Sequence, residues 1–226
     1  MSMGMSAGAP PVAAKDVRSW KLLALMTTAG AIAGLLIVTV YQATLPRIER
    51  HQGEVMQAAI REVLAAPPSV DTLYLYRGAL VKTLPPGASA KGLEKVYLGH
   101  DAAGKRVGFA VSAAENGFQD LVTLMFGYDA SAHRLIAMKV VGNKETPGLG
   151  NKIETDSAFV NGFANAAAPL NGVKAGTGKA GPNDVAMITG ATISSRAVIR
   201  IINDAVARWQ PLMDAYHEDT TRGANP

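Results

Sequence analysis

The pattern of apolar and polar positions begins with a long uncharged run. Residues 22–41 carry no charge, and about 20 apolar residues are enough for a helix to cross a bilayer core of about 30 Å. A cleaved signal peptide is the alternative, but the run is longer than a usual signal sequence and no small-residue cleavage site follows it. We therefore predict a tail over residues 1–20 and a transmembrane helix over residues 21–45.

Basic residues on both sides of this run bear on its orientation. Lys15, Arg18 and Lys21 precede it, whereas Arg47 and Arg50 follow it. Positive charge collects on the cytoplasmic side of a membrane. The three leading residues favour a single-pass protein of the inner membrane with a cytoplasmic N-terminus and a periplasmic C-terminal domain, and the two that follow weaken this prediction. Within the run, Gly30 and Gly34 form a small-residue face for packing against another helix.

A second helical pattern follows the uncharged run. Apolar residues recur at helical spacing after Pro46, and charged residues fill the remaining positions. Pro67 and Pro68 end the pattern. We predict a stalk helix over residues 46–66, which packs on an extracytoplasmic domain formed by residues 67–226.

Short β-prone segments dominate the first half of that domain. They are residues 72–77, 95–98, 106–112, 119–128 and 134–141. Short connections between consecutive strands favour an antiparallel sheet. Helices over 156–166 and 192–209 are expected to cover one face, which gives the class α+β, and residues 164–183 are expected to form a mobile surface loop.

Composition excludes several classes of site. The chain has 226 residues, a formal net charge of +4 and no cysteine, which rules out disulfides and thiolate-bound metal centres within this polypeptide. The modest charge and the absence of an aromatic and basic pattern argue against nucleic-acid binding. The four histidines share no metal-ligand spacing, so no metal site is predicted, and no catalytic acid–base constellation is evident.

The hydroxyl-rich stretch Thr189–Ser194 immediately precedes an amphipathic helix. The free N–H groups and positive dipole of a helix N-terminus favour a phosphate. Gly190 and Ala191 let the backbone pass close to it, and Thr189 and Thr192 have hydroxyls that can donate to it. Serine and threonine are also the favoured N-cap residues, so the residue chemistry alone favours simple capping over anion binding.

A second stretch, Lys144–Glu154, contains a Pro-Gly pair and several small residues. Pro and Gly favour a tight turn, which can be purely structural. Together with Thr189–Ser194, this stretch resembles the signatures of the covalent FMN-binding subunits of Rnf and Nqr redox pumps. The resemblance is specific in the two motifs and is supported by the preceding membrane anchor.

The resemblance implies how FMN is held. Its phosphate is expected to be esterified to Ser194, with Thr192 as the alternative acceptor, by an ApbE-type flavin transferase. The loop containing Glu145, Thr146, Gly148, Leu149, Gly150 and Lys152 is expected to meet the flavin ring. In that loop, Leu149 offers an apolar contact and Thr146 a hydroxyl, whereas a solvated charge pair would also explain Glu145 and Lys152. Family members carry an acidic residue before the hydroxyl motif; Asp184 is the nearest here, and its role is open.

The function implied is that of an electron-transfer protein similar to the G subunit of the Rnf complex. Such complexes couple redox chemistry between NADH and ferredoxin to ion transport, and other membrane subunits would be its partners. A protein similar to the C subunit of Nqr is the near alternative. A non-redox anchored sensor or assembly protein, or a domain that binds a phosphate ligand without a covalent bond, are alternatives of a different class.

Overall fold

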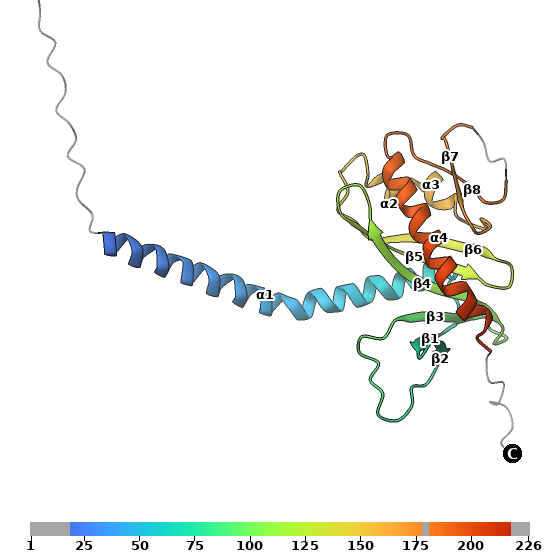
Figure 1. Cartoon of the computed structure of the whole chain (residues 1–226), viewed down its shortest axis with the longest axis horizontal. Helices are drawn as coiled ribbons and strands as arrows, with labels where there is room; N and C mark the ends of the chain where they lie inside the picture. The colour runs from blue at the N-terminus through green and yellow to red at the C-terminus, as the bar shows by residue number, and fades with distance from the viewer. Residues whose placement is uncertain (1–18, 178–180, 218–226) are drawn as a thin grey trace, which may run out of the picture. The chain divides into compact units, whose positions relative to one another are not determined.

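The computed structural model describes residues 19–177 and 181–217 (Figure 1). The described residues form two compact units that divide between Gln52 and Gly53. Most of the predicted N-terminal tail and the last nine residues, 218–226, lie outside the described part of the chain.

The first helix, α1, runs from Ser19 to Val63 with Pro46 inside it, so the predicted anchor and most of the predicted stalk belong to one helix. It is long and apolar enough to cross a membrane. Its large apolar side chains from Trp20 to Tyr41 are exposed, as lipid contact would require. The threonine hydroxyls in this part bond to carbonyls three or four residues earlier, which satisfies them inside the helix.

A six-stranded antiparallel sheet forms the centre of the second unit, in the order β2-β1-β3-β4-β5-β6. The strands are β1 (Ser69–Tyr76), β2 (Ala79–Val81), β3 (Lys95–His100), β4 (Arg106–Asn116), β5 (Leu121–Asp129) and β6 (Arg134–Gly142). The predicted α+β class with a mainly antiparallel sheet is confirmed. The three-residue strand β2 was not predicted, because it is too short to show a period.

Helices cover both faces of this sheet. The C-terminal helix α4 (Thr192–Asp214) buries an apolar stripe against one face, where Phe109 and Phe126 point. The last turns of α1 pack on the opposite face, where Ala59, Ile60 and Val63 meet Ala110 and Met125. Burial on both faces explains why β4 and β5 read as continuous apolar runs.

The segment between the two motifs is more ordered than predicted. The helix α2 (Lys152–Thr155) begins inside the first motif, and it is followed by α3 (Ser157–Asn161) and by the parallel strands β7 (Asn171–Val173) and β8 (Asp184–Ala186). The predicted helix 156–166 therefore shrinks to α3. The predicted mobile loop 164–183 is wrong where the chain is buried at Ala166 and Leu170, because the side chain of Asn203 bonds both the N–H and the carbonyl of Leu170. Residues 178–180 of that loop lie outside the described residues.

Candidate functional site

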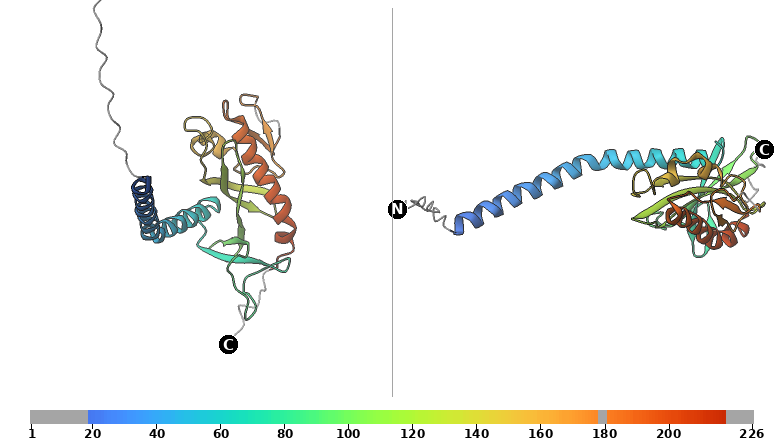
Figure 2. Two further views of the ribbon diagram at one scale, coloured as in Figure 1. Left: turned by 60° about the vertical axis from the view of Figure 1, so that its left-hand side comes forward. Right: turned by 90° about the horizontal axis from the view of Figure 1, so that it is seen from above.

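The two sequence motifs meet in the folded domain, at the N-terminal end of α4 (Figures 1 and 2). The Ser194 hydroxyl donates a hydrogen bond of 2.8 Å to Oε2 of Glu145, 49 positions earlier in the chain. A Cβ built on Gly190 would lie 4.0 Å from Cδ2 of Leu149, in ordinary van der Waals contact. The turn that follows β6 and the turn that precedes α4 therefore form one site.

The first turn of α4 has no side-chain cap. Its N-cap is Ala191, and the first helical bond runs from the Ser195 N–H to the Ala191 carbonyl at 2.9 Å. Capping by Thr189 or Thr192 is therefore not how this helix begins. The N–H groups of the three preceding residues stand outside the helical ladder, which is the arrangement that favours an anion.

Ser195 fixes the turn instead. Its hydroxyl accepts a hydrogen bond from the Ile188 N–H at 3.1 Å and donates one to the Ala191 carbonyl at 2.9 Å. The side chain is fully buried. Sequence reasoning did not assign this role to Ser195, because a run of hydroxyl residues does not reveal which one turns inward.

The hydroxyls of the motif differ in access. Thr189 and Gly190 are exposed and Thr192 is half-buried, whereas Ser194 is only 3% exposed. Ala191 is also buried. Of the two candidate acceptors, Thr192 is the more accessible, and the hydroxyl of Ser194 is already bonded to a carboxylate.

Glu145 is buried in the middle of the site, at 4% exposure. Its Oε1 accepts hydrogen bonds from the N–H groups of Phe118 at 2.7 Å and Gln119 at 3.1 Å. Because the side chain is buried and bonded in this way, the interpretation of Glu145 as half of a solvated charge pair is wrong. Lys152 is half-buried at the start of α2, and among the described residues it forms no ion pair with Glu145.

The Pro-Gly loop forms a tight turn beside Glu145. The Leu149 N–H bonds the Thr146 carbonyl at 3.1 Å, and Gly148 has a φ of +77°, a conformation that favours glycine. The Asn151 side chain accepts from the Gly148 N–H at 2.7 Å. The Thr146 hydroxyl donates to Oε1 of Gln119 at 3.1 Å, so this predicted site residue is held by the β4–β5 turn.

Exposed apolar side chains gather on the segments around Glu145. Apart from Val70, the large apolar side chains that the described part of the chain exposes beyond Gln52 are Phe118, Leu121, Leu149 and Ile193. Phe118 and Leu121 lie at the β4–β5 turn, which bonds Glu145. Leu149 lies in the loop that begins at Glu145, and Ile193 lies next to Ser194, which also bonds Glu145. An apolar surface gathered at one place on a domain indicates a binding surface.

An ion pair lies near this surface. Asp120 and Lys144 form an ion pair of 3.2 Å between the β4–β5 turn and the end of β6. The N–H of Leu121 and the Lys144 ammonium hold the pKa of Asp120 below its usual value.

Asp184 occupies a different place. Its carboxylate accepts hydrogen bonds from the Gly181 N–H at 2.9 Å and from the Asn171 side chain at 2.7 Å. These bonds hold the start of β8 to β7. The structure therefore gives this buried acid a role in the small parallel sheet.

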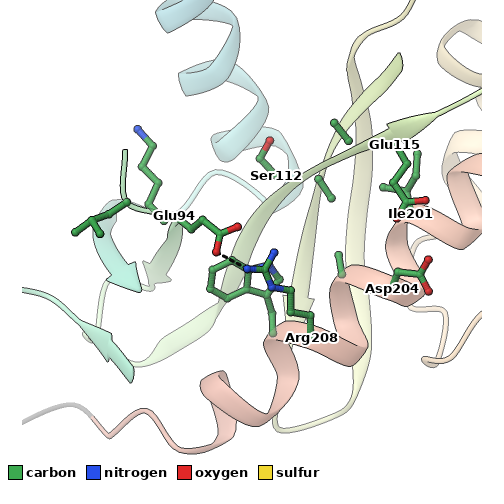
Figure 3. Close-up of a pocket in the computed structure, with 12 residues that line it drawn as sticks. Glu94, Ser112, Glu115, Ile201, Asp204 and Arg208 are labelled. Carbon is green, nitrogen blue, oxygen red and sulfur yellow. Dashed lines mark hydrogen bonds and ion pairs between the residues drawn. The ribbon is translucent and has the colours of Figure 1, made fainter. Parts of the chain in front are cut away.

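A cavity of about 470 Å³ lies elsewhere, between the β3–β4 region and the second half of α4 (Figure 3). Glu94 and Arg208 form an ion pair across it, and Trp209 and Asp204 line it from α4. None of its lining residues belongs to the two motifs, so it is not part of the site built around Glu145.

Comparison with known proteins identifies the class first. The model of the FMN-binding domain family matches residues 117–207, a range that contains the β4–β5 turn and both motifs. In fold, the chain is similar to the crystal structure of Shewanella oneidensis NqrC, with a TM-score of 0.61 and 16% identity over 74% of this chain and all of that one. It is similarly related to the C subunit of the Na(+)-translocating NADH-quinone reductase of Parabacteroides distasonis, with a TM-score of 0.57 and 16% identity over 76% of this chain and 98% of that one. The fold and the site thus define a protein with an FMN-binding domain.

Sequence relatives then identify the family. The G subunit of the ion-translocating oxidoreductase complex of Pseudomonas aeruginosa is 32% identical over 84% of this chain and 88% of its own length. The protein of the same name from Methanosarcina acetivorans is 27% identical over 82% and 92%. The G subunit of the Na(+)-translocating ferredoxin:NAD(+) oxidoreductase complex of Acetobacterium woodii is 29% identical over 85% and 92%. The chain belongs to the family of G subunits of ion-translocating oxidoreductase complexes, which the two motifs had predicted.

Proposed function

We propose that this protein is a membrane-anchored electron-transfer subunit of an ion-translocating Rnf-type complex and carries FMN. The observation that supports this proposal best is the meeting of the two motifs at the uncapped start of α4, inside the region that matches the FMN-binding family. The relatives are named as subunits of ion-translocating redox complexes. They favour an Rnf-type complex over the Nqr alternative, because the likeness to NqrC is one of fold.

The residues at this site fit FMN. The free N–H groups of the first turn of α4 suit a phosphate. Gly190 has no side chain that would obstruct the phosphate at this turn. The exposed Leu149, Ile193 and Phe118 offer an apolar surface to a flat ring system. FMN, when bound, supplies the redox chemistry, whereas the chain holds and orients it.

Attachment is proposed at Thr192, through a phosphoester. Ser194, the acceptor expected from the motif, is buried and bonded to Glu145. The Glu145 carboxylate could accept the proton of the Ser194 hydroxyl. However, this hydroxyl belongs to a residue with 3% exposure, so an attaching enzyme could transfer a phosphoryl group to it only if the site opened. A phosphate on Ser194 would also lie against the negative charge of Glu145. Thr192 is more accessible and belongs to the same turn.

The chemistry of attachment requires a donor. We propose that a flavin transferase of the ApbE type delivers the FMN moiety of a flavin dinucleotide. The Thr192 hydroxyl oxygen bonds to the flavin-side phosphorus, the pyrophosphate P–O bond breaks, and the nucleoside monophosphate leaves with the hydroxyl proton. The product is the chain plus one FMN less one water.

The anchor sets the location that we propose. α1 would cross the inner membrane once, with its N-terminus in the cytoplasm and the FMN domain on the other side, because Lys21 and the basic residues before it precede the span. Gly30 and Gly34 would let a helix of another membrane protein of the complex approach closely.

Intact mass of the full chain tests attachment. We expect the protein, purified from membranes of a host that has the transferase, to carry one FMN less one water. Thr192→Ala should abolish this adduct, whereas Ser194→Ala and the control Thr189→Ala should retain it on Thr192 after prolonged expression, as mapped on peptides. An adduct that survives Thr192→Ala and disappears in Ser194→Ala would place the attachment at Ser194 with the function unchanged. A wild-type chain without any adduct contradicts the covalent proposal.

A further inference from the structure

Glu145 joins the three segments that surround the proposed attachment residue. Its Oε1 is bonded to two N–H groups of the β4–β5 turn, and its Oε2 is bonded to Ser194 in the first turn of α4. Glu145 itself begins the Pro-Gly loop. We propose that Glu145 is a positioning residue, which holds the first turn of α4 so that Thr192 faces the flavin transferase. This inference rests on the proposed function.

Glycines enclose the carboxylate. A Cβ built on Gly150 would lie 2.5 Å from Oε2 of Glu145 and 3.1 Å from Oγ of Ser194, and a Cβ on Gly117 would overlap Oε1. The backbones of both neighbouring turns therefore press on the carboxylate. The two carboxylate oxygens of Glu145 are therefore fixed in position, and no space remains beside them for a larger side chain at Gly117 or Gly150.

The bonding pattern requires an acceptor on both sides. The Phe118 N–H, the Gln119 N–H and the Ser194 hydroxyl all donate, and an ionised carboxylate has only acceptors. Glutamine would present an NH₂ group to one of these partners. In one orientation of the glutamine amide, the NH₂ group would face the N–H groups of Phe118 and Gln119, which are donors as well. In the other orientation, the NH₂ group would face Ser194, whose hydroxyl would then have to accept this hydrogen bond and donate elsewhere.

The helical geometry links this bond to Thr192. Successive residues of an α-helix are rotated by about 100°, so positions 192 and 194 are about 200° apart around the axis. Holding Ser194 inward against Glu145 therefore places Thr192 away from Glu145, at the half-exposed edge of the turn. The same arrangement keeps the negative charge of Glu145 on the opposite side of the turn from the incoming phosphate.

The attachment rate tests this role. Full-length chain would be incubated with purified transferase and flavin dinucleotide, and the FMN adduct followed with time by intact mass. We expect Glu145→Gln and Glu145→Ala to slow attachment at Thr192 at least about tenfold, because small displacements of a reacting group carry large kinetic costs. Ser194→Ala breaks the same link with less disturbance of the fold, and it should also slow the initial rate while still reaching full modification.

Asp184→Asn is the matched control. Asp184 is another buried carboxylate that accepts an N–H bond and a side-chain bond, but it holds β7 and β8. Thermal midpoints of all variants would be measured on the same samples. We expect Asp184→Asn to lower the midpoint and leave the attachment rate within about twofold of wild type, since its bonds with Gly181 and Asn171 lie outside the motif turn.

The outcomes separate the two proposals. Attachment at the wild-type rate in Glu145→Gln and in Ser194→Ala would overturn the positioning role. Equal slowing in the Glu145 and Asp184 variants, in proportion to their loss of stability, would overturn it as well. A wild-type chain that the transferase does not modify would instead count against the proposed function itself.

Discussion

Gly190 and Tyr128 show how single residues set local properties of this domain. Gly190 has a φ of +84°, which lets the chain turn from Thr189 into α4, and a side chain there would be strained by about 1–2 kcal/mol. Tyr128 is fully buried under α4, and its hydroxyl donates to Oε1 of Gln210 at 3.1 Å. Gly190 can adopt its φ because glycine has no Cβ, whereas the burial of Tyr128 arises from the fold around it.

Tyr128 predicts how stability depends on pH. Burial, with Asp214 and Asp129 nearby, raises the pKa of Tyr128 to about 12, above the ordinary value of about 10. Because the folded state holds the proton more tightly, this contribution to stability is full below about pH 10 and is lost as the pH rises through about 12. We expect the free energy of unfolding to fall in this window.

The tyrosinate absorbance of the native protein measures the effect directly, with urea unfolding at each pH as the second readout. In Tyr128→Phe the part of the fall due to this group should disappear. A native protein in which all tyrosines titrate near their ordinary pKa of about 10 would contradict the expectation.

At the scale of elements, the decisive feature is the close approach of α1 to the sheet. A Cβ built on Gly127 in β5 would overlap the carbonyl oxygen of Val63, the last residue of α1. A Cβ on Gly99 in β3 would lie 3.0 Å from the Leu64 side chain. Glycine in both strands thus lets the end of the helix lie directly on the sheet, where Ala59 and Ile60 are buried.

Gly127→Ala is expected to destabilise the domain by about 1–3 kcal/mol, because the atom that the new methyl group meets is backbone and overpacking forces the helix to shift. Thermal or denaturant unfolding of the full chain in detergent measures this. Gly53→Ala, with nothing within 4 Å of its Cβ, is the matched control and should be neutral or slightly stabilising. Equal stability of the Gly127 variant and wild type would show that α1 does not rest on this face.

At the scale of the whole chain, α1 belongs to both units. Its apolar first part suits a membrane, whereas its last turns complete the core of the domain. The domain boundary at residue 67 stays a prediction, but the packing of Ala59, Ile60, Val63 and Leu64 indicates where a separable domain must begin.

Two shortened chains test this boundary. A chain that begins at Gly53 lacks the apolar span and retains the end of α1, so we expect it to leave the membrane fraction and to fold. A chain that begins at Pro67 exposes Ala110 and Met125 and loses the burial that the helix provides. It should have a lower thermal midpoint or aggregate, as differential scanning fluorimetry and gel filtration would show. Equal thermal midpoints of the two shortened chains would support the domain boundary at residue 67.

The sequence by itself determined the features that depend on neighbours along the chain. The uncharged run predicted a membrane helix, the 3.6-residue period predicted α4, and short turns between β-prone segments predicted the antiparallel sheet. These patterns are local, because burial of one or both faces of a helix or strand produces a regular order of apolar residues along the chain. The two motifs also sufficed to predict the family.

Only the tertiary structure decided which motif residues face inward. Glu145 and Ser194 meet across 49 positions, and this contact buries the hydroxyl that the motif had suggested as the acceptor while Thr192 stays more accessible. Phe118 and Gln119 join the site through their backbone N–H groups, which carry no signal in the identity of a residue. Such contacts depend on how the sheet and α4 bring distant turns together, and the order of residues along the chain does not specify that distance.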